Sequence, residues 1–248
     1  MRIFVGFILS ILFSLVPASA QGLASGWSGE GSFSAGVSTG NTETTDLGLS
    51  LDIKKSAGLW THSASAKADF GETDGTETKN RVFLSGRSDY QVAEKTFVFG
   101  VASYEKDEFS GFESRYFLGG GAGRILLEGE QANWKISVAP GIKVDEVRAT
   151  YASGALVTPA ETEESFSVLG NSEFSYQFND NVSFSNNTGV IYAEESTQFT
   201  NTTAITAALT DTLSARFSFD VRHDTNPPLG FESTDTSTRI SIVYKFGA

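Results

Sequence analysis

The sequence contains no cysteine and comparatively few basic residues. Without cysteine, disulfide bonds and thiol chemistry are both excluded. Only 18 Lys and Arg stand against 30 Asp and Glu, so the formal charge is −12. Because a nucleic-acid-binding surface needs a basic footprint, this balance argues against nucleic acid as a partner.

Beyond the first twenty residues, no apolar run is long enough to form a transmembrane helix. Within those twenty, Arg2 supplies a positive charge, residues 3–16 form an apolar core, and residues 18–20 are a small-residue cleavage site. We expect residues 1–20 to be a signal peptide that is cleaved after export through the inner membrane. A retained N-terminal anchor is the alternative. Residues 21–25 are then a short linker, and 26–248 are one folded domain.

The rest of the chain consists of short segments in which polar and apolar residues alternate. In the last of them, Ile240, Ile242 and Tyr244 share one face of an extended strand, whereas Arg239 and Lys245 share the other. About twelve such segments occur, each with roughly the ten residues that a tilted strand needs to cross a membrane. The expected strands are 27–38, 43–54, 59–70, 79–91, 96–107, 113–126, 133–145, 165–178, 182–194, 199–210, 213–223 and 236–246.

The connections between these segments are of two kinds. Short turns are expected near 56–58, 93–95, 128–133, 179–181 and 211–212, and longer polar loops at 71–78, 146–164 and 225–235. This alternation predicts an all-β fold, a transmembrane up-and-down antiparallel β-barrel of about twelve strands with its short turns in the periplasm. A soluble sandwich or ligand-holding barrel is the alternative. It is disfavoured because so wide a barrel leaves an interior that Leu and Phe cannot fill.

The alternation also assigns side chains to the two faces of the barrel wall. The residues expected to line the lumen are Lys67, Asp69, Arg81, Arg87, Asp89, Arg216, Asp220 and Arg239. Trp60, Phe97 and Trp134 each follow a short turn, so they are expected in an outward aromatic girdle at the lipid headgroups, together with Tyr244 and Phe246. Outer-membrane lipids and lipopolysaccharide are therefore expected partners.

No group of residues in the sequence predicts catalysis, a metal site or a cofactor. His62 and His223 are expected near opposite ends of the barrel, so they cannot form one site. Acidic residues cluster near 107–108, 161–164 and 232–235, but none of these clusters has the ligand spacing of a calcium loop. The glycines at 119–123 lack the tail of a phosphate-binding loop and more simply mark close backbone approach.

Several segments resemble a known family along nearly the whole exported chain. They are Gly26–Gly31, Thr39–Thr45, Leu84–Tyr90, Tyr104–Gly111, Val221–Thr236 and Val243–Phe246. In their order and spacing the chain resembles the salt-induced outer-membrane proteins, a bacterial family long carried as a domain of unknown function. The resemblance implies an outer-membrane β-barrel without catalytic residues. The amphipathic C-terminal strand also indicates the outer-membrane barrel assembly machinery and periplasmic chaperones as partners, although Gly247 and Ala248 follow its last aromatic residue.

The function expected from these features is a structural or permeability role in the cell outer membrane of a Gram-negative bacterium. The lumen is expected to be polar and either narrow or plugged, because charges of both signs are nearly balanced along the inward faces. The resemblance adds a connection with salt or osmotic stress. A membrane-embedded lipid-modifying enzyme and a surface barrel that binds a ligand or ion remain as alternatives.

Overall fold

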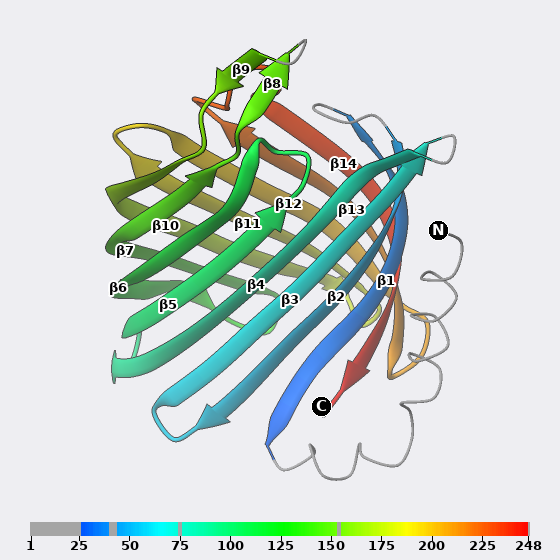
Figure 1. Ribbon diagram of the computed structural model, residues 1–248. Helices are drawn as coiled ribbons and strands as arrows, with labels where there is room; N and C mark the ends of the chain where they lie inside the picture. Colours follow the sequence, from blue (N-terminus) through cyan, green and yellow to red (C-terminus); the bar gives the residue numbers. More distant parts are fainter. Residues whose placement is uncertain (1–25, 40–43, 74–75, 153–154, 248) are drawn as a thin grey trace.

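The protein is a single closed β-barrel of twelve antiparallel strands with one small additional hairpin (Figure 1). The computed structural model describes residues 26–39, 44–73, 76–152 and 155–247, so the predicted signal peptide and linker lie outside the described residues. The barrel strands are β1 (Trp27–Thr39), β2 (Thr44–Ala57), β3 (Trp60–Thr73), β4 (Thr76–Ala93), β5 (Thr96–Asp107), β6 (Phe112–Glu128), β7 (Ala132–Val147), β10 (Glu161–Asn179), β11 (Val182–Ala193), β12 (Thr197–Ala208), β13 (Leu213–Asp224) and β14 (Thr234–Phe246). The additional hairpin is β8 (Thr150–Ala152) with β9 (Ala155–Thr158).

Each barrel strand pairs with its neighbours in the sequence, and β14 closes the barrel by pairing with β1. The closing register runs from Gly29 opposite Phe246 to Thr39 opposite Thr236. Closure leaves no free strand edge, which is a requirement for a sheet surrounded by lipid. The predicted fold class, an up-and-down transmembrane β-barrel of about twelve strands, is confirmed.

The two ends of the barrel differ in their connections. At the short-turn end, strands are joined by residues 58–59, 94–95, 129–131, 180–181 and 209–212. At the long-loop end, residues 225–233 join β13 to β14, and the β8–β9 hairpin projects between β7 and β10 (Figure 1). Both chain ends of the barrel, the start of β1 and the end of β14, lie at the short-turn end.

Two of the predicted loops are shorter than expected. The predicted loop 71–78 is wrong, because β3 continues to Thr73 and β4 begins at Thr76, with a register shift between Gly71 and Glu72. The predicted loop 146–164 is partly strand, since β7 extends to Val147 and β10 begins at Glu161. Polar residues made these stretches resemble loops. A strand that continues past the apolar part of the wall can be polar on both faces, so alternation does not mark its end.

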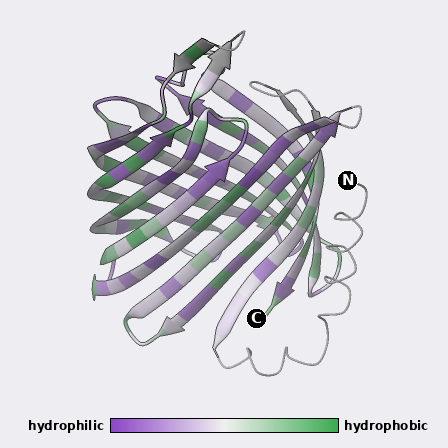
Figure 2. Cartoon of the chain, viewed as in Figure 1, coloured by the Kyte–Doolittle hydropathy of each residue, from purple (hydrophilic) through white to green (hydrophobic). Residues whose placement is uncertain are grey.

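The outward face of the wall carries many exposed apolar side chains, and Figure 2 shows hydrophobic and hydrophilic residues interspersed along the strands. Apolar residues that alternate with polar ones in β2, β13 and β14 are exposed: Leu47, Leu49, Leu51, Phe217, Phe219, Ile240 and Ile242. Most of their neighbours in sequence are polar and point to the opposite face, with Val243 as an apolar exception. In the described ranges, no helix is long and apolar enough to cross a membrane, a finding that concerns helices only.

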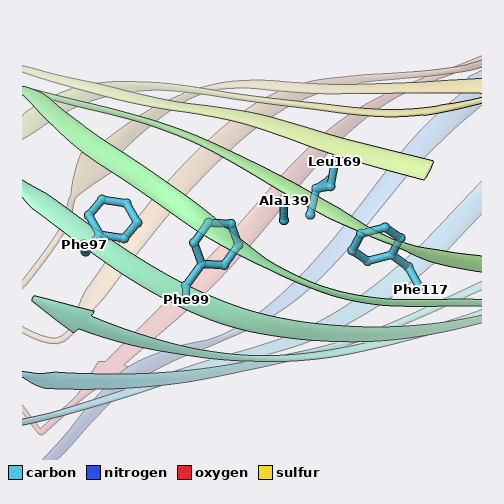
Figure 3. Packing of buried hydrophobic residues seen from close by; sticks show 5 residues of the cluster. All are labelled: Phe97, Phe99, Phe117, Ala139 and Leu169. Carbon is cyan, nitrogen blue, oxygen red and sulfur yellow. The ribbon is translucent and has the colours of Figure 1, made fainter. Parts of the chain in front are cut away.

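One sector of the inner wall is apolar as well. The side chains of Phe97, Phe99, Phe117, Ala139 and Leu169 form an aromatic cluster on β5, β6, β7 and β10 (Figure 3). The prediction that Phe97 belongs to the outward girdle is therefore wrong, since its side chain is only 8% exposed. The error has a physical cause. In β5 both faces are apolar near Phe97, so the usual contrast between the faces is absent there.

Glycines beneath the aromatic cluster let its rings lie against the backbone. A Cβ atom added at Gly123 would overlap the Phe97 ring, and one added at Gly119 or Gly141 would overlap the Phe117 ring. The glycines at 119–123 thus provide the close approach expected of glycine inside a strand. Because these rings lie directly over glycines, they approach the wall closely and form one apolar sector of it.

Candidate functional site

The lumen is the candidate functional site, and its wall carries charges of both signs. Every residue that the sequence assigns to the lumen lies on the inward face: Lys67, Asp69, Arg81, Arg87, Asp89, Arg216, Asp220 and Arg239. These side chains do not form one site. Asp69, Arg81 and Arg239 join a network that spans the lumen. Arg87 with Asp89, and Arg216 with Glu30, form local pairs instead.

Arg222 forms the contact that crosses the lumen. Its guanidinium lies 2.5 Å from Glu105 and 3.2 Å from Asp107. Arg222 is on β13, whereas both acids are on β5, which is half-way around the barrel in the strand order. A pair between diametrically opposed strands requires both side chains to reach into the lumen and meet there.

Two further arginines extend this contact around the wall. Arg81 on β4 lies 2.7 Å from Glu105 and 3.4 Å from Asp69 on β3. Arg239 on β14 lies 2.7 Å from the other oxygen of Asp69, which is only 3% exposed. We call these six residues the cross-lumen network: Asp69, Arg81, Glu105, Asp107, Arg222 and Arg239. Three arginines face three carboxylates, so the network is neutral as a whole when all are charged.

A second group of ion pairs lies beside the cross-lumen network, on β6, β7 and β13. Arg115 on β6 lies 2.5 Å from Asp224 on β13 and 3.4 Å from Asp145 on β7. Lys143 lies 2.8 Å from Asp145 and donates a hydrogen bond of 2.8 Å to Ser196, between β11 and β12. Because Arg115 and Asp224 are also on well-separated strands, this group adds a second set of bridges across the lumen.

The half of the lumen toward the short-turn end is more open. Lys67, Glu173 and Asn187 lie on inward faces there and are exposed. A cavity of about 470 Å³ lies against β1, β2, β3 and β14, with Glu30, Asp52, Lys54, Ser65 and Lys245 among its lining residues. We call this half the vestibule.

The charged pairs of the vestibule stay close to the wall. Arg216 pairs with Glu30 at 2.6 Å, and only β14 lies between their strands. Arg87 pairs with Asp89 at 2.9 Å, and its guanidinium lies 3.7 Å from the centre of the Phe99 ring. Arg87 therefore covers the aromatic cluster rather than bridging the lumen.

The sequence did not single out several members of these networks. Glu105 and Arg115 each have a polar neighbour, so alternation is weak there. Lys143 and Asp145 fall on the polar face of their strand by alternation but were not among the expected lumen residues. Asp107 was interpreted as part of an acidic loop cluster, but it ends β5 and pairs with Arg222. No sequence signal indicates which arginine reaches which acid, because the partners come from strands far apart in the chain.

On the outward face, His62 lies close to a serine. Its Nδ1 atom is 2.9 Å from the hydroxyl of Ser88 on the next strand, and its ring stacks on Trp60. In the described part of the chain, no carboxylate contacts the His62 ring. His223 is near the other end of the barrel and hydrogen-bonds to Thr234. Across the described ranges, no three His, Cys, Asp or Glu side chains are grouped as metal ligands.

The remaining predicted girdle residues are on the outward face at the short-turn end. Trp60 and Trp134 lie near the starts of β3 and β7, and both are exposed. Tyr244 and Phe246 lie at the end of β14. The register puts them on the same face as the outward Ile240 and Ile242. Phe97 is absent from this group because it turns inward.

A family model matches residues 31–246 of the chain, and its description is "Protein of unknown function, DUF481". The chain belongs to this family. The prediction of a β-barrel family without an established function is thereby confirmed. A relative from Escherichia coli (strain K12), the uncharacterised protein YdiY, is 25% identical over 223 residues, which cover 87% of this chain and 82% of YdiY.

Solved structures with the same fold include a porin, a translocator and a channel. The NanC porin is 14% identical with a TM-score of 0.56, and the match covers 87% of this chain and all of the porin. The translocator domain of the autotransporter NalP from Neisseria meningitidis is 13% identical with a TM-score of 0.52, covering 98% and 97%. An outer-membrane channel from Pseudomonas putida F1 is 10% identical with a TM-score of 0.52, covering 89% and 95%. At these identities the likeness concerns the fold.

Proposed function

We propose that this DUF481 protein is an outer-membrane barrel with a permeability role, whose lumen is closed toward the outside and open toward the periplasm. The short-turn end faces the periplasm in this orientation, as in bacterial outer-membrane barrels generally. The apolar outward face and the fold shared with a porin and an outer-membrane channel support the location. The vestibule is then the periplasmic half of the lumen.

The observation that carries the proposal is the ion pair between Arg222 and Glu105. It joins opposite walls near the outer end, where an open pore would need free space. Charged side chains that meet across a lumen obstruct the path of a solute and also screen one another from it. We therefore propose a lumen that is closed or very narrow in its resting state.

Single-channel recording in a planar bilayer tests this proposal. The unmodified protein should show little conductance. The Arg222→Gln variant, which loses the pair with Glu105 and Asp107, should show frequent or larger openings. Arg216→Gln is the matched control, because it removes an arginine of the same strand whose pair with Glu30 stays near the wall. A stable, large conductance in the unmodified protein would refute the closed state.

Ionic strength is the condition that links the cross-lumen network to salt stress in this proposal. The screening length of dissolved salt falls from about 10 Å at 0.1 M to about 3 Å at 1 M, and it acts more on the half-buried Arg222 and Glu105 than on the buried Asp69. Raising the salt concentration should thus weaken the network and raise the open probability. The mean current should then rise by more than the increase in ion concentration alone would produce. The same recordings at two salt concentrations would test this step.

We propose no enzymatic reaction for this barrel. A hydrolase that uses serine and histidine needs a third group to orient the imidazole and donors that stabilise the oxyanion. His62 and Ser88 supply the first two members only. A binding role for the outer loops likewise has no specific observation in its favour.

A further inference from the structure

Four polar side chains form a connected patch on the outward face of β11 and β12. They are Asn186 and Thr188 on β11, and Thr203 and Asn201 opposite them on β12. Their direction follows from the register, because they share a face with Ile205, which is exposed on the outer surface. We call these four residues the Asn–Thr patch.

The Asn–Thr patch lies midway along the two strands. Phe184 and Ile205 flank it toward the short-turn end, and Val190 and Phe199 flank it toward the long-loop end. Apolar residues on both sides indicate that the patch lies within the apolar band rather than at a membrane surface. In the proposed outer-membrane location it therefore faces the hydrocarbon interior.

The side chains of the patch hydrogen-bond to one another in a closed ring. The Asn186 amide donates to Thr203 at 2.8 Å, and Thr203 donates to Asn201 at 3.0 Å. The Asn201 amide donates to Thr188 at 2.7 Å, and Thr188 donates to the Asn186 carbonyl at 3.2 Å. This ring reduces the cost of placing polar groups in hydrocarbon, but it does not use all of them.

Hydrogen-bonding capacity is left over on both amides. Each amide nitrogen has two hydrogens and each amide oxygen has two lone pairs. Within the described residues, Asn201 uses one amide hydrogen, and the Asn186 oxygen accepts one bond from Thr188. The patch therefore presents a spare donor and a spare acceptor side by side, which is a combination that another amide can satisfy.

Lipid cannot satisfy these groups at this depth. Acyl chains have no hydrogen-bonding atoms, and the headgroups lie at the membrane surfaces. Polar side chains inside a membrane instead promote association with another polar protein surface. A second copy of this chain provides such a surface at the matching depth, because every copy inserts in the same orientation.

We propose that the Asn–Thr patch is a contact surface between two copies of this chain, which associate side by side about a two-fold axis along the membrane normal. A two-fold contact uses the same patch on both partners. The spare donor of one copy then meets the spare acceptor of the other, and the flanking apolar residues pack around the polar centre. This inference depends on insertion in a membrane and not on whether the lumen is closed.

The first test measures association of the full-length protein in lipid vesicles at low protein density. The double variant Asn186→Leu with Asn201→Leu should associate about tenfold more weakly than the unmodified protein, a change of the size that a few intramembrane hydrogen bonds produce. It should still fold, because an outward leucine is compatible with lipid; heat-dependent migration in gel electrophoresis checks this. Asn80→Leu, an outward asparagine on distant β4, is the matched control and should leave association unchanged.

The second test uses the absence of cysteine, which makes any introduced thiol unique. Val190→Cys, next to the patch but outside its ring, should form a disulfide-linked dimer under oxidation in vesicles. Leu49→Cys, at the middle of β2, should not. A monomeric protein in vesicles, unchanged association of the double variant, or equal cross-linking at both positions would each overturn the proposal, as would association with another protein in place of a second copy.

Discussion

Arg222 and Glu105 come from strands on opposite sides of the barrel, and their charged groups meet at 2.5 Å inside the lumen. The Glu105 carboxylate also lies 2.7 Å from the Arg81 guanidinium, so it pairs with two guanidinium groups from different strands. The barrel wall is thus braced across its interior as well as hydrogen-bonded around its circumference.

This bracing predicts a measurable coupling between Arg222 and Glu105. Arg222→Gln should lower the free energy of unfolding by about 1–3 kcal/mol, because it leaves partly buried carboxylates without one partner. Glu105→Gln should also destabilise the barrel. Urea unfolding in lipid vesicles of both single variants and the double variant gives the coupling energy. Additive effects of the two changes would show that the pair contributes nothing to stability.

A charge placed on the outward face should be costly. Leu49 lies near the middle of β2 and faces outward, so Leu49→Arg should lower the free energy of unfolding in a bilayer by roughly 2–4 kcal/mol. Leu49→Ile provides the control for the loss of leucine itself. A detergent-free, soluble and fully folded monomer of the unmodified protein would contradict the membrane assignment on which this prediction rests.

The contact between Gly123 and the Phe97 ring should make this glycine intolerant of a side chain. Gly123→Ala should cost about 1–3 kcal/mol, because the ring must leave its position. Adding Phe97→Leu should recover part of that loss. Gly86→Ala is the control, since a Cβ there meets no atom within 4 Å, and its effect should stay within about 0.5 kcal/mol. Equal costs for the two alanines would argue against the ring contact.

Chemical labelling can locate the open half of the lumen. Lys67→Cys places a single thiol in the vestibule, where a charged maleimide added from the periplasmic side should react quickly. The same reagent added outside intact cells should react slowly. Leu229→Cys, in the exposed loop between β13 and β14, should show the opposite preference. Rapid labelling of Lys67→Cys from outside would mean that the cross-lumen network does not close the lumen.

The strands were predictable where one face is polar and the other apolar. In β13, Arg216 and Asp220 alternate with Phe217 and Phe219, and the predicted directions agree with their observed exposure and contacts. Phe97 was expected to face outward because it follows a short turn, and alternation gave no contrary signal because β5 has apolar residues on both faces near its start. The inward Phe97 packs over Gly123 on the neighbouring strand β6, and the sequence of β5 alone carries no information about that packing.

The site was predictable only as a set of inward charges. Which side chains meet depends on the strand order, the tilt of the strands and the width of the barrel, none of which is encoded within a single strand. Arg222 meeting Glu105 is the clearest case, since the two residues lie on strands that share no hydrogen bond. Likewise, Asn186 and Asn201 look like isolated polar interruptions of two strands until the register brings them side by side.

The pairing of β1 with β14 has a consequence for how quickly the chain can reach this structure. Gly29 and Phe246 are partners although almost the entire chain lies between them. Such a contact has a large loop-closure entropy, and folding slows as contacts become more distant in sequence. The edge of β1 therefore stays unpaired until the last strand, β14, has formed. The period of greatest exposure to aggregation and proteolysis is set by that delay and not by the thermodynamic stability of the finished barrel.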